Sequence, residues 1–289
     1  MSRIAYVDGR YLALYKRSIY PEDRGYQFAD SVYEVVHLCN GRMIDESRHL
    51  DRLDRSLGAL RIPPPMGRAA LSKVLRELVW RNRVRDGLVY LQVSRGVARR
   101  EHAFPVPPPK PTLVATVRRL PPFPTDAGAW AGTAITWPDE RWARCDIKST
   151  ALLPNVLAKQ AARERGAIEA ILVRSDDTVT EGSSTNVWIV DENGTLRTRE
   201  LGHAILPGCT RATLIALMHE LGFAFEEAAF DGDALRRARE VFVTSATSFV
   251  RPIVQIDGVP VGDGKVGPVT LRLFELLTRH VKGRAPVAG

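Results

Sequence analysis

A proline-rich stretch in the first half of the chain is the feature that most constrains its fold. The run Arg-Leu-Pro-Pro-Phe-Pro-Thr-Asp-Ala-Gly occupies residues 119–128. Proline lacks a backbone N–H and stiffens the chain, so such a run is typical of a connector and not of a helix or sheet interior. The run predicts a small N-terminal domain at 1–119, a linker at 120–129 and a larger C-terminal domain at 130–289.

The segment before the linker predicts an α+β unit. Asp8-Gly9 and Asn40-Gly41 are turn sequences flanked by strand-like runs, which indicates β-hairpins over 4–12 and 32–45. Leu50, Leu53 and Leu57 recur at helical spacing and give one apolar face. The helices expected here cover residues 46–60 and 71–84, and the further strands cover 88–95 and 112–117.

Strand and helix patterns alternate after the linker, which is typical of an α/β unit. The expected strands lie at 133–137, 170–173, 186–190 and 241–244, and the expected helices at 155–164, 210–221 and 270–280. The sequence therefore predicts a two-domain α+β / α/β protein.

Lys148 follows Asp146-Ile147 and opens a small-polar, apolar stretch that leads into a helix. Partial burial of a lysine favours its neutral amine, which can attack a carbonyl group. Most lysines are simply solvated, so this position alone is a weak indication of catalysis.

Glu181 stands directly before the turn Gly-Ser-Ser-Thr-Asn at 182–186, which runs into an apolar strand. A carboxylate at the mouth of such a turn can accept a hydrogen bond from a protonated heterocycle nitrogen. An exposed turn glutamate is the alternative interpretation of this residue.

Two further segments have the chemistry of an anion site. Leu206-Pro-Gly-Cys-Thr leads from a loop into a helix, so the amides of Cys209 and Thr210 lie at the positive end of the helix dipole. The segment 242–249 places hydroxyl residues after an apolar strand. A plain capped helix and an ordinary Ser/Thr turn are the alternatives.

The order Asp-Ile-Lys, Thr-Glu-Gly-Ser-Ser-Thr-Asn and Leu-Pro-Gly-Cys-Thr-Arg resembles the class IV aminotransferases, which are fold-type IV enzymes that use pyridoxal 5'-phosphate (PLP). The resemblance covers nearly the whole chain. It implies that Lys148 binds PLP covalently and moves the proton, and that Glu181 pairs with the pyridine nitrogen.

The same resemblance implies the other cofactor contacts. Many relatives have a phosphate-binding threonine where this chain has Ala246, so either Thr247 or the backbone amide takes that role. Leu206 is expected to pack against the ring, and Arg52 in His-Leu-Asp-Arg to bind the phosphate. The complete set of expected cofactor-binding residues is Arg52, Lys148, Glu181, Ser184, Leu206, Cys209, Thr210, Ala246 and Thr247.

Two N-terminal segments are similar to the D-amino acid aminotransferase branch of the family. They are Arg-Gly-Tyr-Gln-Phe-Ala-Asp-Ser-Val-Tyr at 24–33 and Leu-Gln-Val-Ser-Arg-Gly-Val-Ala-Arg-Arg-Glu-His at 91–102. The resemblance implies that Tyr33, Arg100 and His102 bind the substrate carboxylate, with the Arg-x-His pair supplied by the second subunit of a homodimer. Without the family context, Tyr33 would be a strand residue and the Arg-x-His pair a basic surface loop.

The expected activity is transamination of a D-amino acid with a 2-oxo acid acceptor such as 2-oxoglutarate or pyruvate. Aminodeoxychorismate lyase and branched-chain L-amino acid aminotransferase share the general pattern and are the alternatives.

The composition disfavours several other kinds of partner and ligand. The net charge of +8 comes from 41 basic and 33 acidic residues that are interspersed, and only 7% of residues are aromatic, which disfavours a nucleic-acid partner. Cys39, Cys145 and Cys209 have no metal-ligand spacing, so we expect no metal. Their odd number and the absence of an apolar leader or membrane-length run predict a cytoplasmic protein with no membrane partner.

Overall fold

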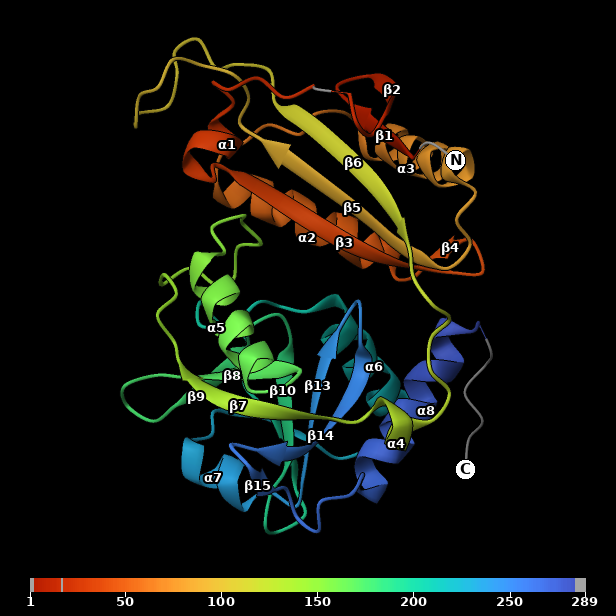
Figure 1. The fold of residues 1–289 in the computed structure, drawn as a ribbon, viewed down its shortest axis with the longest axis vertical. Helices are drawn as coiled ribbons and strands as arrows, with labels where there is room; N and C mark the ends of the chain where they lie inside the picture. The colour runs from red at the N-terminus through yellow and green to blue at the C-terminus, as the bar shows by residue number, and fades with distance from the viewer. Residues whose placement is uncertain (1–2, 17, 284–289) are drawn as a thin grey trace. The chain divides into compact units, whose positions relative to one another are not determined.

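The computed structural model describes residues 3–16 and 18–283 (Figure 1). The chain divides into two compact units, one of residues 1–122 with 147–151 and the other of residues 123–146 with 152–289. The extreme ends of the two predicted domains, residues 1–2 and 284–289, lie outside the described residues. Each unit is described by itself.

The N-terminal unit is built on a six-stranded sheet in the order β2-β1-β6-β5-β3-β4. All neighbouring strands are antiparallel. The strands are β1 (Ile4–Val7), β2 (Arg10–Ala13), β3 (Ser31–Cys39), β4 (Arg42–Met43), β5 (Gly87–Ser94) and β6 (Thr112–Arg119). Both predicted hairpins are present, at β1–β2 and β3–β4.

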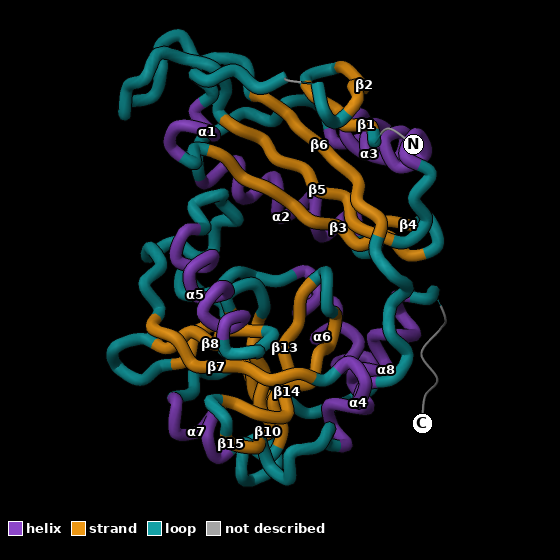
Figure 2. The backbone as a smooth tube through the Cα atoms, viewed as in Figure 1, coloured by secondary structure: helices purple, strands orange, loops and turns teal. Residues whose placement is uncertain are grey.

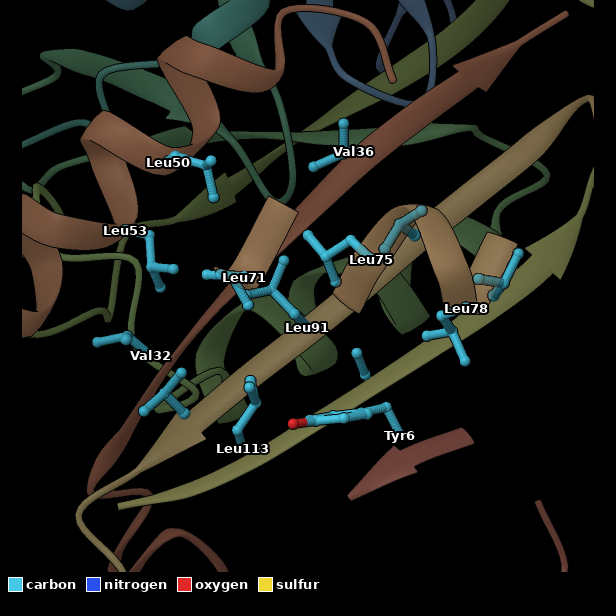
Figure 3. Close-up of a cluster of buried hydrophobic side chains, with 14 of the residues drawn as sticks. Tyr6, Val32, Val36, Leu50, Leu53, Leu71, Leu75, Leu78, Leu91 and Leu113 are labelled. Carbon is cyan, nitrogen blue, oxygen red and sulfur yellow. The ribbon is translucent and has the colours of Figure 1, made fainter. Parts of the chain in front are cut away.

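Two long helices, α2 (Glu46–Ala59) and α3 (Arg68–Asn82), cover one face of this sheet (Figures 1 and 2). Their leucines pack onto buried residues of β3, β5 and β6, as the close-up in Figure 3 shows for Leu53, Leu75 and Leu91. Burial of this apolar surface is the main term that stabilises the unit. A short helix, α1 (Arg24–Phe28), precedes β3.

Strand β3 presents two different faces because successive side chains alternate across a strand. Val32 and Val36 point into the helix-covered core. Glu34 lies on that same face and pairs with Arg52 of α2. Tyr33 therefore lies on the opposite face of the sheet, away from the two helices.

The C-terminal unit is built on a nine-stranded mixed sheet in the order β12-β11-β10-β13-β14-β7-β8-β9, with β15 paired to β14. The strands are β7 (Gly132–Pro138), β8 (Glu169–Val173), β9 (Val179–Gly182), β10 (Asn186–Val190), β11 (Leu196–Thr198), β12 (Glu226–Glu227), β13 (Glu240–Ser245), β14 (Phe249–Ile256) and β15 (Val259–Pro260). Strand β7 runs parallel to both β8 and β14.

Helices pack against this second sheet (Figure 1). They are α4 (Ala127–Trp130), α5 (Leu153–Glu164), α6 (Cys209–Glu220), α7 (Gly232–Arg237) and α8 (Pro268–Val281). Alanines of α5 pack on Ile135 and Leu172, whereas the alternate residues Ala134 and Ile171 join a core that includes Leu235 of α7. Helices α5 and α7 therefore cover opposite faces of the sheet.

The observed elements agree with the expected mixture of α+β and α/β organisation. Sequence patterns did not indicate the short elements α1, α4 and α7 or the strands β9, β11 and β14. Helix α4 begins within the predicted linker and ends one residue beyond it, and the side chain of Asp126 accepts hydrogen bonds from the amides of Gly128 and Ala129. Among the described residues, no helix has the length and apolarity that crossing a membrane requires.

Candidate active site

Lys148 lies on a five-residue segment, 147–151, that belongs to the N-terminal unit although the chain on both sides of it belongs to the other unit. The backbone carbonyl of Lys148 accepts a hydrogen bond from the amide of Tyr33 at 3.0 Å, and Thr150 N donates to the carbonyl of Ser31 at 3.1 Å. The amide of Lys148 also donates to Ser56 Oγ of α2 at 3.3 Å. These bonds fix the lysine beside the edge of β3.

The side chain of Lys148 lies over the ring of Tyr33, with Nζ 4.3 Å from the ring centroid. Tyr33 packs in turn against Tyr90 of β5, with ring centroids 5.8 Å apart. Burial, with a smaller contribution from Tyr33, raises the pKa of Tyr90 to about 12, so its phenol is protonated at neutral pH. The structure thus brings together the expected cofactor lysine and one expected carboxylate-binding residue.

Arg52 is buried on α2 and forms a side-on pair with Glu34 of β3. Its Nε lies 2.8 Å from Glu34 Oε1 and its Nη2 lies 2.7 Å from Oε2. His49 Nδ1 lies 2.7 Å from the same carboxylate. Burial alone would raise the pKa of Glu34, but the charge and hydrogen bonds of Arg52, with help from His49, lower it to about 2. Binding of a phosphate by Arg52 remains a prediction.

Arg100 and His102 lie on an exposed loop, and a buried arginine binds the backbone of this loop. Arg24 of α1 donates hydrogen bonds to the loop carbonyls of Glu101, His102 and Ala103. Three loop carbonyls bound by one guanidinium give this segment a defined backbone path.

Asp30 accepts hydrogen bonds from both Arg24 Nε, at 2.8 Å, and Arg95 Nε, at 2.6 Å. Although burial raises the pKa of Asp30, these two arginines lower it below its usual value overall. The carboxylate is therefore ionised at neutral pH and anchors the arginine that holds the loop.

The side chains of Arg100 and His102 both lie against Phe28. The guanidinium carbon of Arg100 is 5.0 Å from the Phe28 ring centroid, and the His102 ring centroid is 5.4 Å from it. Within the part of the chain that the structure describes, neither residue is hydrogen-bonded to Tyr33. The unit therefore holds two separate pairs of expected residues, Tyr33 with Lys148 and Arg100 with His102.

Glu181 is buried on β9 of the C-terminal unit, where several donors fix its carboxylate. The amide of Leu206 lies 3.1 Å from Oε1 and 3.0 Å from Oε2. Asn186 Nδ2 donates to Oε2 at 3.0 Å and to the carbonyl of Leu206 at 2.9 Å. Arg141 Nη1 donates to Oε1 in a short ion pair. The structure thus joins two expected residues, Glu181 and Leu206, through the Leu206 backbone.

Arg141 also forms a two-point pair with Asp139. The sequence patterns indicated neither residue, because Asp-x-Arg after a strand is common on solvated loops. Burial is opposed by the hydrogen bonds from Arg141, so the pKa of Asp139 lies below its usual value.

The Gly-Ser-Ser-Thr turn after Glu181 is organised by a second buried acid, Glu169. Ser184 Oγ donates to it at 3.1 Å and Thr185 Oγ1 at 3.0 Å, and Ser183 makes a shorter hydrogen bond. Glycine at 182 suits this turn, because a Cβ at this position would lie 2.1 Å from Thr185 Oγ1 and would displace that hydroxyl. Ser184 is exposed, and its role toward a cofactor remains a prediction.

Cys209 and Thr210 are the first two residues of helix α6 and both are buried. In the part of the chain that the structure describes, no side chain caps this helix end. Gly208 precedes it, and a Cβ there would lie 2.1 Å from Asn186 Oδ1, so a larger residue would displace the Asn186 side chain. A helix start of this kind suits an anion, since its first amides point outward along the positive end of the dipole.

The turn after β13 contains Ala246 and Thr247. Ser245 Oγ lies 3.0 Å from Thr247 Oγ1 and 2.7 Å from Ser248 Oγ, so the hydroxyl groups of this turn bind one another. Thr247 is exposed. Binding of a phosphate by its hydroxyl or by the Ala246 amide stays a prediction.

The residues present fit a PLP cofactor. Among its described residues, the C-terminal unit contains a buried carboxylate of fixed orientation, which can accept a hydrogen bond from a protonated ring nitrogen, and a helix start without a side-chain cap, which can bind a phosphate. The N-terminal unit contains an amine against an aromatic ring. The carboxylate is a hydrogen-bond acceptor, the amides of the helix start are donors, and the amine is a nucleophile. A PLP cofactor needs all three kinds of group.

Comparison with known proteins decides the family. The sequence profile of the family described as "Amino-transferase class IV" matches residues 31–256. The chain belongs to the class IV aminotransferases. Enzymes of this family depend on PLP, so the expected family and cofactor are confirmed.

Individual relatives agree with this assignment. A D-alanine aminotransferase from Listeria monocytogenes is 42% identical over 261 residues, which are 90% of each chain. One from Staphylococcus aureus is 36% identical over 280 residues, 97% of this chain and 98% of the relative. The crystal structure of a T.th. branched-chain amino acid aminotransferase with pyridoxamine 5'-phosphate superposes with a TM-score of 0.88 at 25% identity, covering 99% of this chain and 96% of the other. The expected fold-type IV architecture is thereby confirmed.

Protonation of Glu34 should destabilise the fold at low pH. The folded-state pKa of about 2 lies below the usual 4.5, so the pair stabilises the protein above pH 4.5 and loses its effect as the pH falls toward 2. The contribution at neutral pH is about 3 kcal/mol, since each pKa unit corresponds to about 1.4 kcal/mol. Urea unfolding of wild type and Glu34→Gln should show this difference at pH 7, and it should shrink as the pH falls.

The matched control is Glu77→Gln, which removes an exposed pair with Arg81 on α3. Its effect should stay below about 1 kcal/mol at either pH. A Glu34→Gln effect as small as that of the control, or one that is equal at pH 7 and pH 3, would contradict the assignment.

Proposed function

We propose that the protein is a PLP-dependent aminotransferase that transfers the amino group of a D-amino acid to a 2-oxo acid. The observation that carries the proposal is the identity, 42% and 36% over at least nine-tenths of the chain, with relatives named D-alanine aminotransferases. The placement of Tyr33 beside the Lys148 amine supports it, since both residues are expected to act on the substrate.

Lys148 provides the amine that holds the cofactor and then moves a proton at the substrate α-carbon. PLP, when bound, supplies an electron sink for the negative charge that develops at that carbon. Glu181 accepts a hydrogen bond from the protonated ring nitrogen and keeps that proton in place. The fixed amide of Leu206 and the side chain of Asn186 hold the glutamate in one orientation.

The phosphate group is proposed to bind at the start of α6 through the amides of Cys209 and Thr210, with Arg52 as the charged partner. The turn at 245–248 contributes through Thr247 or the amide of Ala246, and Ser184 contacts the cofactor from the turn after Glu181. Leu206 packs against the ring. Each role rests on the family resemblance and is compatible with the burial and geometry described above.

The substrate carboxylate is proposed to bind Tyr33 and the Arg100-x-His102 pair. An arginine fork binds a carboxylate with two hydrogen bonds, and a phenol and an imidazole add directional donors. The defined loop path set by Arg24 supports this role, because a binding loop that is already ordered loses less entropy on binding.

We further propose a cytoplasmic homodimer in which the partner subunit supplies Arg100 and His102. Exposed apolar side chains on the N-terminal unit support an interface, since Tyr15 and Tyr26 are each 79% exposed and Val106 is 94% exposed. The odd number of cysteines, three, and the lack of a disulfide-framework spacing favour a reducing compartment.

A branched-chain L-amino acid aminotransferase is the second candidate, because the solved structure reported above is of that kind. Its identity of 25% is lower than the 42% and 36% of the D-alanine aminotransferases. The substrate's handedness therefore separates the two candidates.

The handedness of the substrate should be measurable in a single half-reaction. PLP-loaded protein mixed with D-alanine or D-glutamate should change its cofactor absorbance roughly a hundredfold faster than with L-leucine or L-alanine, a difference of about 2.7 kcal/mol in barrier. Faster reaction with L-leucine would support the branched-chain candidate. Turnover of aminodeoxychorismate to pyruvate without a 2-oxo acid would instead indicate a lyase.

Arg100→Lys should raise KM for every D-amino acid by a similar factor, roughly tenfold or more, because the carboxylate is common to all of them and lysine cannot bind it with a fork. Arg99→Lys is the matched control on the same loop and should leave KM unchanged. Equal effects of the two substitutions would remove Arg100 from the site.

The placement of Arg100 in the partner subunit can be tested with the same residue. Inactive Arg100→Ala and inactive Lys148→Ala chains should regain partial activity when mixed into hybrid dimers, because one of the two sites is then complete. Hybrids that form, as seen by native mass spectrometry, but remain inactive would contradict the contribution across subunits.

A further inference from the structure

A buried charge cluster lies behind Glu181 in the C-terminal unit. It consists of Asp139, Arg141 and Glu181, whose side chains are 4%, 6% and 7% exposed. Arg141 Nε lies 2.9 Å from Asp139 Oδ1, and its Nη2 lies 2.9 Å from Oδ2. The remaining nitrogen, Nη1, donates to Glu181 Oε1. One guanidinium therefore bridges two carboxylates.

Arg141 also donates hydrogen bonds to uncharged groups. Its Nη2 also contacts the Ala204 carbonyl at 3.1 Å and Thr180 Oγ1 at 3.2 Å, and the same hydroxyl donates to Asp139 Oδ2 at 2.7 Å. Both partners of the arginine are thus fixed by further hydrogen bonds. The guanidinium is fixed at all three nitrogens and cannot swing away from Glu181 without breaking several bonds.

The charge count of the cluster explains why two acids are present. Asp139 and Glu181 contribute −2 and Arg141 contributes +1, so the three side chains sum to −1. An isolated buried carboxylate tends to take up a proton, which the guanidinium opposes. A guanidinium alone would also repel a protonated ring nitrogen, and Asp139 offsets that repulsion.

The pKa directions agree with an ionised Asp139 and an ionised Arg141. Burial would lower the pKa of Arg141, but the hydrogen bond to Asp139 and the charge of Glu181 raise it above its usual value. A further titratable group that faces the cluster is Cys145, and burial raises the pKa of its thiol to about 11. Cys145 is therefore neutral at pH 7, and the charge of Arg174 lowers the pKa of this thiol by a smaller amount than burial raises it.

We propose that Asp139 and Arg141 are positioning residues that keep Glu181 ionised and oriented and thereby set how tightly the bound cofactor's ring nitrogen holds its proton. This inference rests on the proposed function, specifically on the pairing of Glu181 with that nitrogen. Neither residue contacts the cofactor in the proposal; both act through Glu181.

The test measures the ring nitrogen directly. PLP labelled with ¹⁵N at the pyridine nitrogen is bound to the holoenzyme, and solid-state NMR follows its resonance with pH. Asp139→Asn removes one negative charge with little change in shape. The ring nitrogen should then hold its proton roughly tenfold less tightly, the effect of one unit charge at about 10 Å in an effective dielectric of about 20.

A neighbouring arginine provides the matched control. Arg144 forms the same two-point pair with Asp146, again two residues apart in the chain, but its side chain is 41% exposed. Arg144→Met should leave the ring-nitrogen titration at the wild-type position. A shift in Asp139→Asn no larger than in Arg144→Met overturns the proposal.

Glu181→Gln separates this proposal from the function on which it rests. If Glu181→Gln moves the resonance and Asp139→Asn does not, Asp139 and Arg141 do not affect the protonation of the ring nitrogen. The proposed pairing of Glu181 with that nitrogen then still stands. If Glu181→Gln leaves the resonance unchanged, the proposed pairing of Glu181 fails and the present inference fails with it.

A second measurement needs no cofactor. Arg141→Met leaves two buried carboxylates side by side, so one of them must remain protonated in the folded state. The unfolding temperature of the Arg141→Met apoprotein, relative to wild type, should therefore fall as the pH rises from about 4 to 7, because the unfolded chain loses that proton near pH 4. A difference that does not vary with pH would mean that Arg141 acts by packing alone and would overturn its role in keeping Glu181 ionised.

Discussion

The position of Lys148 depends on one backbone pairing, in which residues 148–150 lie against the edge of β3. The amide of Tyr33 binds the carbonyl of Lys148, and Thr150 binds Ser31. The chain enters and leaves this segment from the other unit, so five residues belong to a unit that their chain neighbours do not share, and Ser149 forms an isolated antiparallel bridge with Val32 of β3. Because backbone bonds hold the segment, the lysine side chain itself is not needed for anchoring and remains available for chemistry.

Each unit also contains a buried arginine that neutralises a buried acid, and both pairs involve residues with proposed roles. Burying charges is expensive, and such pairs seldom add net stability compared with apolar residues of the same size. In the N-terminal unit the pair is Glu34 with Arg52. In the C-terminal unit Arg141 joins Asp139 to Glu181. We interpret both as charges retained for binding a charged cofactor.

Long periodic elements could be predicted from the sequence, whereas side-chain partnerships could not. The apolar spacing of Leu50, Leu53 and Leu57 predicted α2, because a helix face is a local property of the chain. The pairing of Glu34 with Arg52 depends on β3 and α2 packing together, and Asp139–Arg141 lies on a loop without periodicity. The roles of Lys148 and Glu181 came from the order of motifs, and the structure adds their surroundings.

The most direct test of the account is to locate the lysine that binds the cofactor. The PLP-loaded protein is reduced with borohydride and digested, and the peptide that carries the phosphopyridoxyl group is identified by mass spectrometry. The chain contains seven lysines, and we predict the modification at Lys148 alone. Stoichiometric modification of any of the other six, with Lys148 unmodified, would contradict it.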